Sequence, residues 1–308
     1  MRARNAWGVA LFSALLSSAQ VTCAHDSPEH EIEALTEKMR ANGASATLLA
    51  RRASEWQSLR KLDHAQADLE HAILLGSDSV GLRTELARIQ AAQRHFDAAH
   101  KTLERALTLA EEGMERCSVY MQRAEVREAN GEHALAVEDC ERAFGVPSPP
   151  LDWYLTRARL TGRTGRWREC ARGLKEGLEK SGSIVLEIEW IEALIDAGEC
   201  REALDRIQPH MVRARRKSSW LIRQGRAQAG MNSQAEAQSS LKAALQEIET
   251  RLDAAKPEGR LLAERGLAHA LLGNRPAAAQ DLEKARMLLG EAAPFTSCIE
   301  RLERVLGK

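Results

Sequence analysis

The sequence predicts an all-α fold built from repeated helices, and the spacing of small residues is the main reason. A pattern of Ala, then Leu or Cys four residues later, then Ala three residues after that recurs along the chain, as in Ala136, Cys140 and Ala143. Spacings of three and four place side chains on one helix face, so each copy supplies one buried stripe. The first small residue of each copy recurs at Ala65, Ala99, Ala136, Cys170, Ala203, Ala237 and Ala278.

The intervals between these positions are 34, 37, 34, 33, 34 and 41 residues. A unit of this length, copied several times, is typical of a helical solenoid in which each unit buries its apolar face against its neighbours. Twelve residues before each position lies a second column of mostly small residues, which predicts a second helix in every unit: Ala53, Ala87, Ala124, Ala158, Ile191, Gly225 and Gly266.

Composition supports the same fold class. Of the 308 residues, 29% are charged and only 4% are aromatic, which suits helices with charged outer faces and argues against a β-sandwich. The formal net charge is zero. Nucleic-acid binding is therefore not expected, because it usually requires a basic surface.

These columns make residues 46–292 resemble the tetratricopeptide-repeat (TPR) family, whose unit has small residues at repeat positions 8, 20 and 27. The resemblance implies a right-handed superhelical solenoid of about seven antiparallel helix pairs. Glycine at the turn within a pair can end a helix in a left-handed conformation, and four units have it. The turn residues are Arg60, Arg94, Gly131, Gly165, Gly198, Asn232 and Gly273, and the units begin near Ala46, Val80, Cys117, Leu151, Ile184, Ser218 and Gly259.

Capping helices are expected at both ends of the array, because the end of a solenoid otherwise exposes an apolar surface. In residues 25–45, Ser27 and Pro28 predict a helix start, and Gly43 predicts its end. In residues 293–308, a helix is expected to begin at Pro294, with charged residues facing water: Glu300, Arg301, Glu303 and Arg304.

Three irregularities predict local departures from the regular array. Residues 111–113 lengthen the junction before the third unit by three residues. The step of 41 residues predicts a longer helix over about residues 235–255, because seven added residues keep the same face buried. Pro209 predicts a kink or an early helix end in the fifth unit.

Residues 1–24 have the pattern of a secretory signal peptide, with a basic start, an apolar run over residues 9–16 and small residues after it. The chain is therefore expected to be exported, to the periplasm if it is bacterial. No later apolar run predicts a transmembrane span in the mature protein. Cys23 suggests a lipid anchor, but the residues before it lack the expected leucine and small residue, which favours simple cleavage.

No sequence motif indicates catalysis or a cofactor, so the chain is not expected to be an enzyme. There is no glycine-rich phosphate loop, no Gly-x-Ser-x-Gly, no Cys-x-x-Cys and no His-Glu-x-x-His. Cys140 and Cys170 occupy columns of core residues, which favours free packed thiols. A disulfide between Cys170 and Cys200 is an alternative in an exported protein.

Candidate binding residues come from the resemblance, which places position 9 of each first helix in the concave groove. These residues are Ser54, Arg88, Glu125, Arg159, Glu192, Arg226 and Leu267. Five consecutive members alternate in charge. They could form a ladder of ion pairs between neighbouring units, or bind the carboxylates and cations of an extended peptide. The family's clamp for chaperone tails uses Asn at this position, and none is present.

The sequence thus predicts a non-catalytic scaffold that binds a partner protein or peptide through Arg88, Glu125, Arg159, Glu192 and Arg226. Two alternatives remain open. One is a copper-handling protein, in which cleavage after Ala24 frees the His25 amine and imidazole for a metal ion, with help from His30. The other is an accessory subunit that docks an envelope enzyme.

Overall fold

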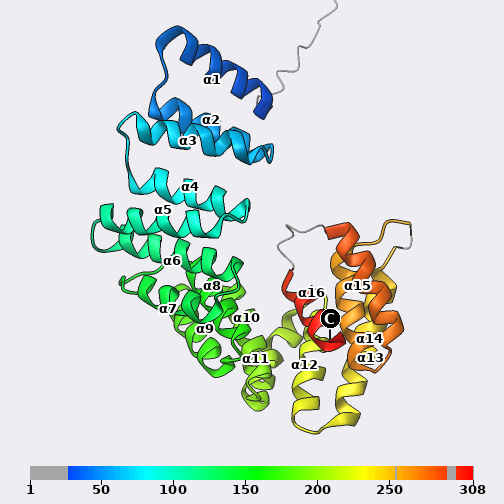
Figure 1. Ribbon diagram of the computed structural model, residues 1–308. Helices are drawn as coiled ribbons and strands as arrows, with labels where there is room; N and C mark the ends of the chain where they lie inside the picture. The colour runs from blue at the N-terminus through cyan, green and yellow to red at the C-terminus, as the bar shows by residue number, and fades with distance from the viewer. Residues whose placement is uncertain (1–26, 254, 290–295, 308) are drawn as a thin grey trace, which may run out of the picture. The chain divides into compact units, whose positions relative to one another are not determined.

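The protein is described from a computed structural model, which covers residues 27–253, 255–289 and 296–307. Within these ranges the fold is all-α, with sixteen helices and no strand (Figure 1). The helices are α1 (Pro28–Asn42), α2 (Ala46–Ser58), α3 (Leu62–Leu74), α4 (Val80–Ala92), α5 (Phe96–Leu109), α6 (Met114–Ala129), α7 (His133–Ala143), α8 (Leu151–Arg163), α9 (Trp167–Ser181), α10 (Ile184–Asp196), α11 (Cys200–Arg213), α12 (Ser218–Gly230), α13 (Gln234–Arg251), α14 (Gly259–Leu271), α15 (Arg275–Leu289) and α16 (Thr296–Leu306).

The chain divides into two compact units, residues 1–102 and 103–308, which are described separately. In the first unit, α1 packs on α2, α2 pairs with α3, and α3 packs on α4. In the second unit, each even-numbered helix from α6 to α14 pairs with the helix that follows it. We call the first helix of each pair an A helix and the second a B helix. The predicted fold class, an array of TPR-like helix pairs, is confirmed.

Small residues at the helix contacts set the packing distance within each pair. Ala124, Ala136 and Ala143 of the α6–α7 pair have no exposed surface. Glycine fills the column where helices approach more closely: a Cβ atom on Gly225 would lie 2.8 Å from the Leu241 side chain, and one on Gly266 would lie 2.8 Å from the Leu302 side chain. Contacts this short exclude a side chain, so these positions require small residues.

The turns within pairs adopt the left-handed conformation that the sequence predicts. Gly131, for example, has a φ of 80°. The three turns without glycine adopt the same conformation, with φ angles of 59° at Arg60, 65° at Arg94 and 62° at Asn232. The packing of the two helices therefore sets the geometry of the turn, even where a Cβ atom makes the left-handed conformation unfavourable.

Buried ion pairs join the A and B helices in three pairs, at equivalent positions sixteen residues apart. Arg123 of α6 donates two hydrogen bonds to Asp139 of α7, at 2.6 and 2.7 Å. The same bidentate contact links Arg52 with Asp68 and Arg265 with Asp281. Two parallel bonds fix relative orientation as well as distance. These pairs therefore set the register of one helix on the other.

Six of the seven predicted unit starts coincide with the first residue of an A helix, and the exception is α6. It begins at Met114, three residues before the predicted start at Cys117. The three added residues of this junction extend the helix by almost one turn. Gly113, with a φ of 96°, immediately precedes it.

Two other expectations about the helices need correction. The long helix of the sixth unit ends at Arg251 rather than near residue 255, because Leu252 turns to extended backbone with a ψ of 110°. Part of the seven-residue insertion therefore forms the connection to α14. In the fifth unit, α11 continues past Pro209 to Arg213, so the early helix end is wrong, and the kink at Pro209 stays a prediction.

The predicted signal peptide, residues 1–24, and the predicted helix start at Pro294 lie outside the described residues. The domain boundaries predicted there stay predictions. Across the part of the chain that the structure describes, no helix combines the length and apolarity needed to cross a membrane.

Enlarging a small residue in the column should destabilise the protein. Ala143 is fully buried, so Ala143→Leu should lower the free energy of unfolding by about 1–3 kcal/mol through overpacking. Ala134 is exposed on the same helix, and Ala134→Leu is the matched control. Thermal unfolding followed by circular dichroism measures both, and equal melting temperatures would contradict the packing described for this column.

Candidate functional site

The predicted row at position 9 changes from exposed to buried along the chain. Ser54, Arg88, Glu125 and Arg159 are exposed, whereas Glu192 and Leu267 are buried and Arg226 is half-buried. The change occurs within the second unit, between α8 and α10. The seven equivalent positions therefore do not form one uniform surface.

The exposed members make short-range contacts with their neighbours. In the first unit, Arg88 donates to Glu85 of the same helix and to Gln57 of α2, at 3.0 Å in the second case. In the second unit, Arg159 forms an ion pair with Glu128 of α6.

The buried members form the centre of an ion-pair network. Glu192 contacts Arg226 and, at 2.9 Å, Arg223, both on the next A helix. Arg226 also contacts Asp196 at 2.6 Å. The row therefore does form an interhelical ladder at this point, as one of the two sequence interpretations expected.

A third arginine reaches Glu192 from the far end of the chain. Arg301 of α16 lies 3.0 Å from Glu189 and 3.4 Å from Glu192. Burial alone would raise the pKa of Glu192, but Arg301, Arg226 and Arg223 outweigh it and hold that pKa below its usual range. Glu192 is thus an ionised carboxylate at a buried position.

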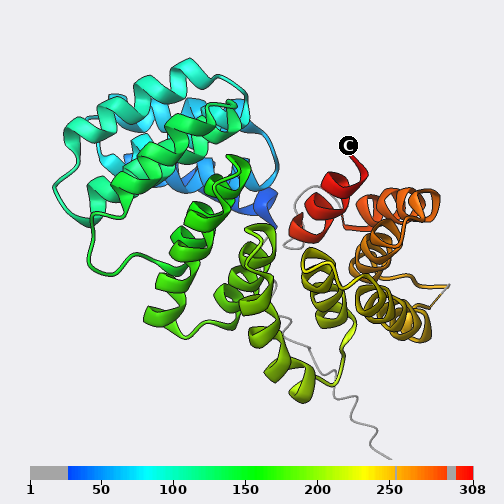
Figure 2. The same ribbon diagram turned by 90° about the horizontal axis from the view of Figure 1, so that it is seen from below.

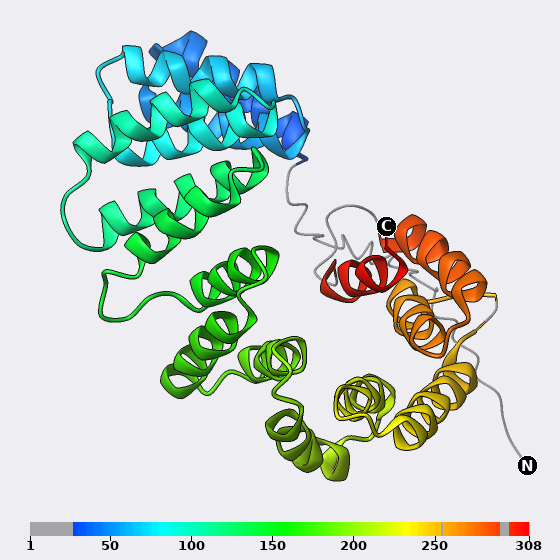
Figure 3. The ribbon, with the colours of Figure 1, turned by 60° about the horizontal axis from the view of Figure 1, so that its bottom comes forward.

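The last helix, α16, has two faces with different contacts. Its apolar residues Ile299, Leu302 and Leu306 are buried, and the helix packs on α14 and α15 (Figure 2). Its charged face meets α8, α10 and the start of α9. Figure 3 shows α16, in red, on the inner side of the curve that the A helices of the second unit form.

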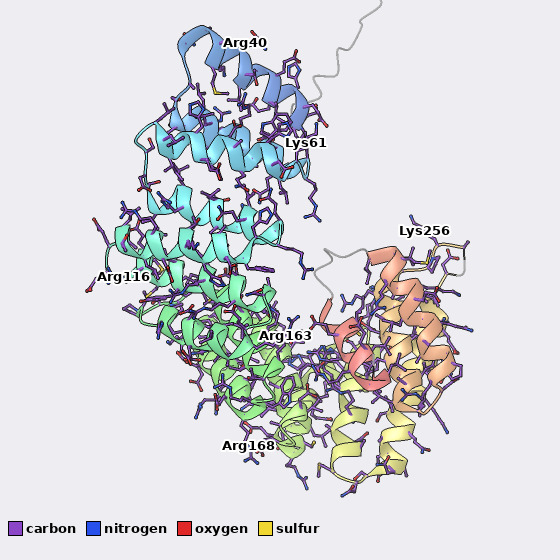
Figure 4. All side chains as sticks on the ribbon, in the orientation of Figure 1. Arg40, Lys61, Arg116, Arg163, Arg168 and Lys256 are labelled. Carbon is purple, nitrogen blue, oxygen red and sulfur yellow. The ribbon has the colours of Figure 1, made fainter. Side chains whose placement is uncertain are left out.

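The expectation that the charged residues of this helix all face water was wrong for Arg301, whose side chain is only 12% exposed. Arg304 contacts Asp196 at 3.1 Å and lies over the Trp167 ring. Glu300 lies 3.7 Å from Arg163 of α8, whose side chain Figure 4 shows on the side of the ribbon facing α16. These contacts span more than a hundred residues, so no local pattern could predict them.

Glu189, Glu192 and Asp196 lie on one face of α10, and we call them the acidic stripe. They are bound by four arginines of α12 and α16: Arg223, Arg226, Arg301 and Arg304. The stripe therefore holds the C-terminal helix against the middle of the second unit. Breaking one of these buried pairs would leave uncompensated charges.

Closure by α16 leaves a cavity of 490 Å³ between the A helices α10, α12 and α14 and the last helix, α16, and we call it the C-terminal cavity. Its lining combines apolar groups with both signs of charge: Val185, Ile188, Glu189, Glu192, Arg216, Ser218, Ser219, Trp220, Ile222, Arg223, Arg251, Glu258, Arg260, Leu261, Glu264, Leu267, Cys298 and Arg301. A second cavity of 320 Å³ lies against α8 and α10, and Arg301 also lines it. Arg301 thus borders both spaces.

The structure gives no support to a metal site or a disulfide within the described residues. Cys117, Cys140, Cys170, Cys200 and Cys298 are free, so the alternative bridge between Cys170 and Cys200 is absent. Burial raises the pKa of the Cys140 thiol to about 12. No cluster of His, Cys, Asp and Glu able to hold a metal ion occurs in the described ranges. His25, the proposed copper ligand, lies outside them.

Comparisons with known proteins identify the fold. No protein-family model matches the sequence, and curated proteins give no match. Among solved structures, a TPR protein from Parabacteroides merdae has a TM-score of 0.57 at 16% identity, over 85% of this chain and 99% of that one. The C-terminal part of a TPR protein from Cytophaga hutchinsonii has a TM-score of 0.55 at 12% identity, over 82% and 98%.

Yeast Tom70 has a TM-score of 0.50 at 16% identity, over 90% of this chain and 59% of that one. The likeness to these three structures is a likeness of fold. The chain therefore has the tetratricopeptide-repeat fold that the small-residue columns predicted.

Neutralising the central carboxylate should destabilise the second unit in a pH-dependent way. Glu192→Gln should cost about 3–5 kcal/mol at neutral pH, because it leaves buried arginines without their charge partner. Because the folded pKa of Glu192 is depressed, this stabilisation is present above the unfolded pKa of about 4.3 and is lost as pH falls below it. The difference in melting temperature between parent and variant should therefore shrink from pH 6 toward about pH 3.

Glu202→Gln, on the exposed side of α11, is the control for this measurement and should have little effect at any pH. A pH-independent loss in Glu192→Gln, or none, would show that the carboxylate is not held ionised by its arginines.

Proposed function

We propose that the protein is a non-catalytic scaffold that binds a partner protein through the exposed part of its A helices. The observation that carries this proposal is that position 9 stays solvent-exposed and polar on A helices of each unit, at Ser54 and Arg88 in the first and at Glu125 and Arg159 in the second. Within each unit, the repeat fold presents these equivalent positions on successive A helices, which suits contact with an extended segment of a partner.

The charges at these positions favour a polar, sequence-selective contact. Arg88 and Arg159 each offer a planar guanidinium, and Glu125 offers a carboxylate between them in the sequence. Arg88 donates to Glu85 and Gln57, whereas Arg159 is bound to the buried Glu128. The exposed contact of Arg88 with Glu85 contributes at most about 1 kcal/mol, so a partner can replace it at little cost.

The buried part of the row plays a different role in this proposal. Glu192 and Arg226 are bound within the protein, so they contribute to the structure of the second unit rather than to partner contact. Of the five residues predicted to bind a partner, the proposal therefore retains Arg88, Glu125 and Arg159.

Affinity capture with matched variants tests the proposal. The triple variant Arg88→Gln, Glu125→Gln and Arg159→Gln removes the exposed charges, and a control triple variant, Arg168→Gln, Arg201→Gln and Glu202→Gln, makes the same net change on exposed B-helix positions. We expect at least one protein to be retained by the parent and the control, and about tenfold less by the first variant, as loss of roughly 1.4 kcal/mol predicts.

Quantitative mass spectrometry measures the captured proteins, and titration with the purified partner confirms direct binding. Circular dichroism should show that both variants are folded. Equal capture of every protein by the parent, the triple variant and the control would show that the exposed A-helix residues are not the binding site.

A further inference from the structure

The C-terminal cavity lies beside a cluster of cations that the network around Glu192 does not use. The α11–α12 connection and its flanks carry four cations in five residues, Arg213, Arg215, Arg216 and Lys217, and all four are exposed. Arg216 also lines the cavity. The α13–α14 connection, where Figure 4 labels Lys256, leads to Arg260, which lines the same cavity and has a side chain that is 55% exposed.

The end of the α11–α12 connection and the start of α12 are held against α13 and α14 by a small hydrogen-bond network. Both oxygens of Glu247 accept hydrogen bonds from the Lys217 backbone N–H, each at 2.9 Å. Arg251 donates to the Ser218 hydroxyl at 3.1 Å, and that hydroxyl donates to the buried Glu264 at 3.0 Å. The cavity mouth is therefore built before any ligand arrives, which lowers the entropic cost of binding.

The charged residues of the cavity wall fall into two groups: carboxylates paired with arginines in the interior, and cations at the rim. Inside, Glu189 and Glu192 are bound by Arg301 and Arg223, and Glu264 is bound by Ser218 and Arg260. At the rim, Arg216 and Arg260 line the cavity together with Glu258, and the exposed Arg215 and Lys217 are the chain neighbours of Arg216. The rim thus attracts negative charge, while the interior is close to neutral.

Apolar groups line the space beyond the rim. Ile188 of α10, Trp220 and Ile222 of α12, and Leu261 and Leu267 of α14 all border the cavity. Together with its volume of 490 Å³, this lining suits one or two large apolar side chains. A ligand that matches both the rim and the apolar lining would place its negative charge at the rim and an apolar group in the cavity.

We propose that the C-terminal cavity binds an acidic peptide segment that places an apolar side chain inside and its carboxylates on the rim. A peptide fits better than a nucleic acid, because several carboxylates line the wall and would repel a dense row of phosphates, whereas a peptide can space its charges. The proposal rests on the proposed function as a protein-binding scaffold and assigns the partner a second, chemically defined contact.

Fluorescence anisotropy of the full chain tests this assignment. The probe is a short fluorescein-labelled peptide with a central Leu-Phe pair flanked on both sides by Glu and Asp. Comparison peptides replace Leu-Phe by Gly-Gly, or the acidic residues by Lys. We expect the acidic peptide with Leu-Phe to bind more tightly than either comparison peptide, and to weaken as salt is raised.

Two variants distinguish the contribution of the rim to peptide binding from that of the cavity interior. Arg215→Glu with Arg216→Glu, in an exposed connection, should weaken binding by about tenfold or more, whereas the matched reversal Arg168→Glu with Arg201→Glu should leave it unchanged. Ser219→Trp narrows the cavity and should abolish the preference for Leu-Phe over Gly-Gly.

Absence of binding, equal binding by all variants, or tighter binding of oligoadenylate RNA or phosphatidylserine vesicles would overturn the assignment. The capture experiment described above uses different residues. A partner captured through the exposed A-helix residues, without peptide binding, would therefore refute only the cavity. Peptide binding without such a partner would refute only the exposed A-helix surface.

Discussion

Close approach of helices through small residues is the constraint on which the structure depends. The helices are mostly 11 to 16 residues long, a length at which an isolated helix is marginal in water. Their stability must therefore come from packing against neighbours. Ala136 and Ala143 have no exposed surface, and Gly225 and Gly266 leave no room for a Cβ atom. Each pair can thus form only if these positions stay small.

Charge is used in the interior to fix register and to close the second unit. Bidentate pairs such as Arg123 with Asp139 repeat at equivalent positions in three helix pairs. The acidic stripe on α10 acts over a longer range, because it binds arginines from both α12 and α16. Buried ion pairs contribute little net stability but penalise any arrangement that separates them. They therefore select one packing among several that apolar contacts would allow.

The repetitive part of this fold was predictable from the sequence, because its determinants recur at a fixed interval. Six of seven A-helix starts and the position of every turn within a pair followed from the small-residue columns. The arginine and aspartate pairs could have been found in the same way, since Arg52, Arg123 and Arg265 each directly precede a small residue of the second column. They were missed because only apolar and small residues were aligned.

The remaining features could not be predicted, because they depend on contacts between distant segments. Nothing near Arg301 in the sequence indicates Glu189, which is 112 positions away. The sequence of alternating charges is the same whether the row faces water or packs against another helix. The change from the exposed Arg159 to the buried Glu192 therefore could not be predicted from it. The C-terminal cavity depends on α16, because Cys298 and Arg301 of that helix form part of its lining.

The most direct test of this account is a double-mutant cycle between α10 and α16. Arg301→Met, Glu192→Gln and the double variant are compared with the parent by thermal unfolding, with Arg301→Met and Glu202→Gln as the control pair. The structure predicts a coupling of about 1–3 kcal/mol between Arg301 and Glu192 and none in the control. Additive effects of the first pair would show that the C-terminal helix does not lie against α10.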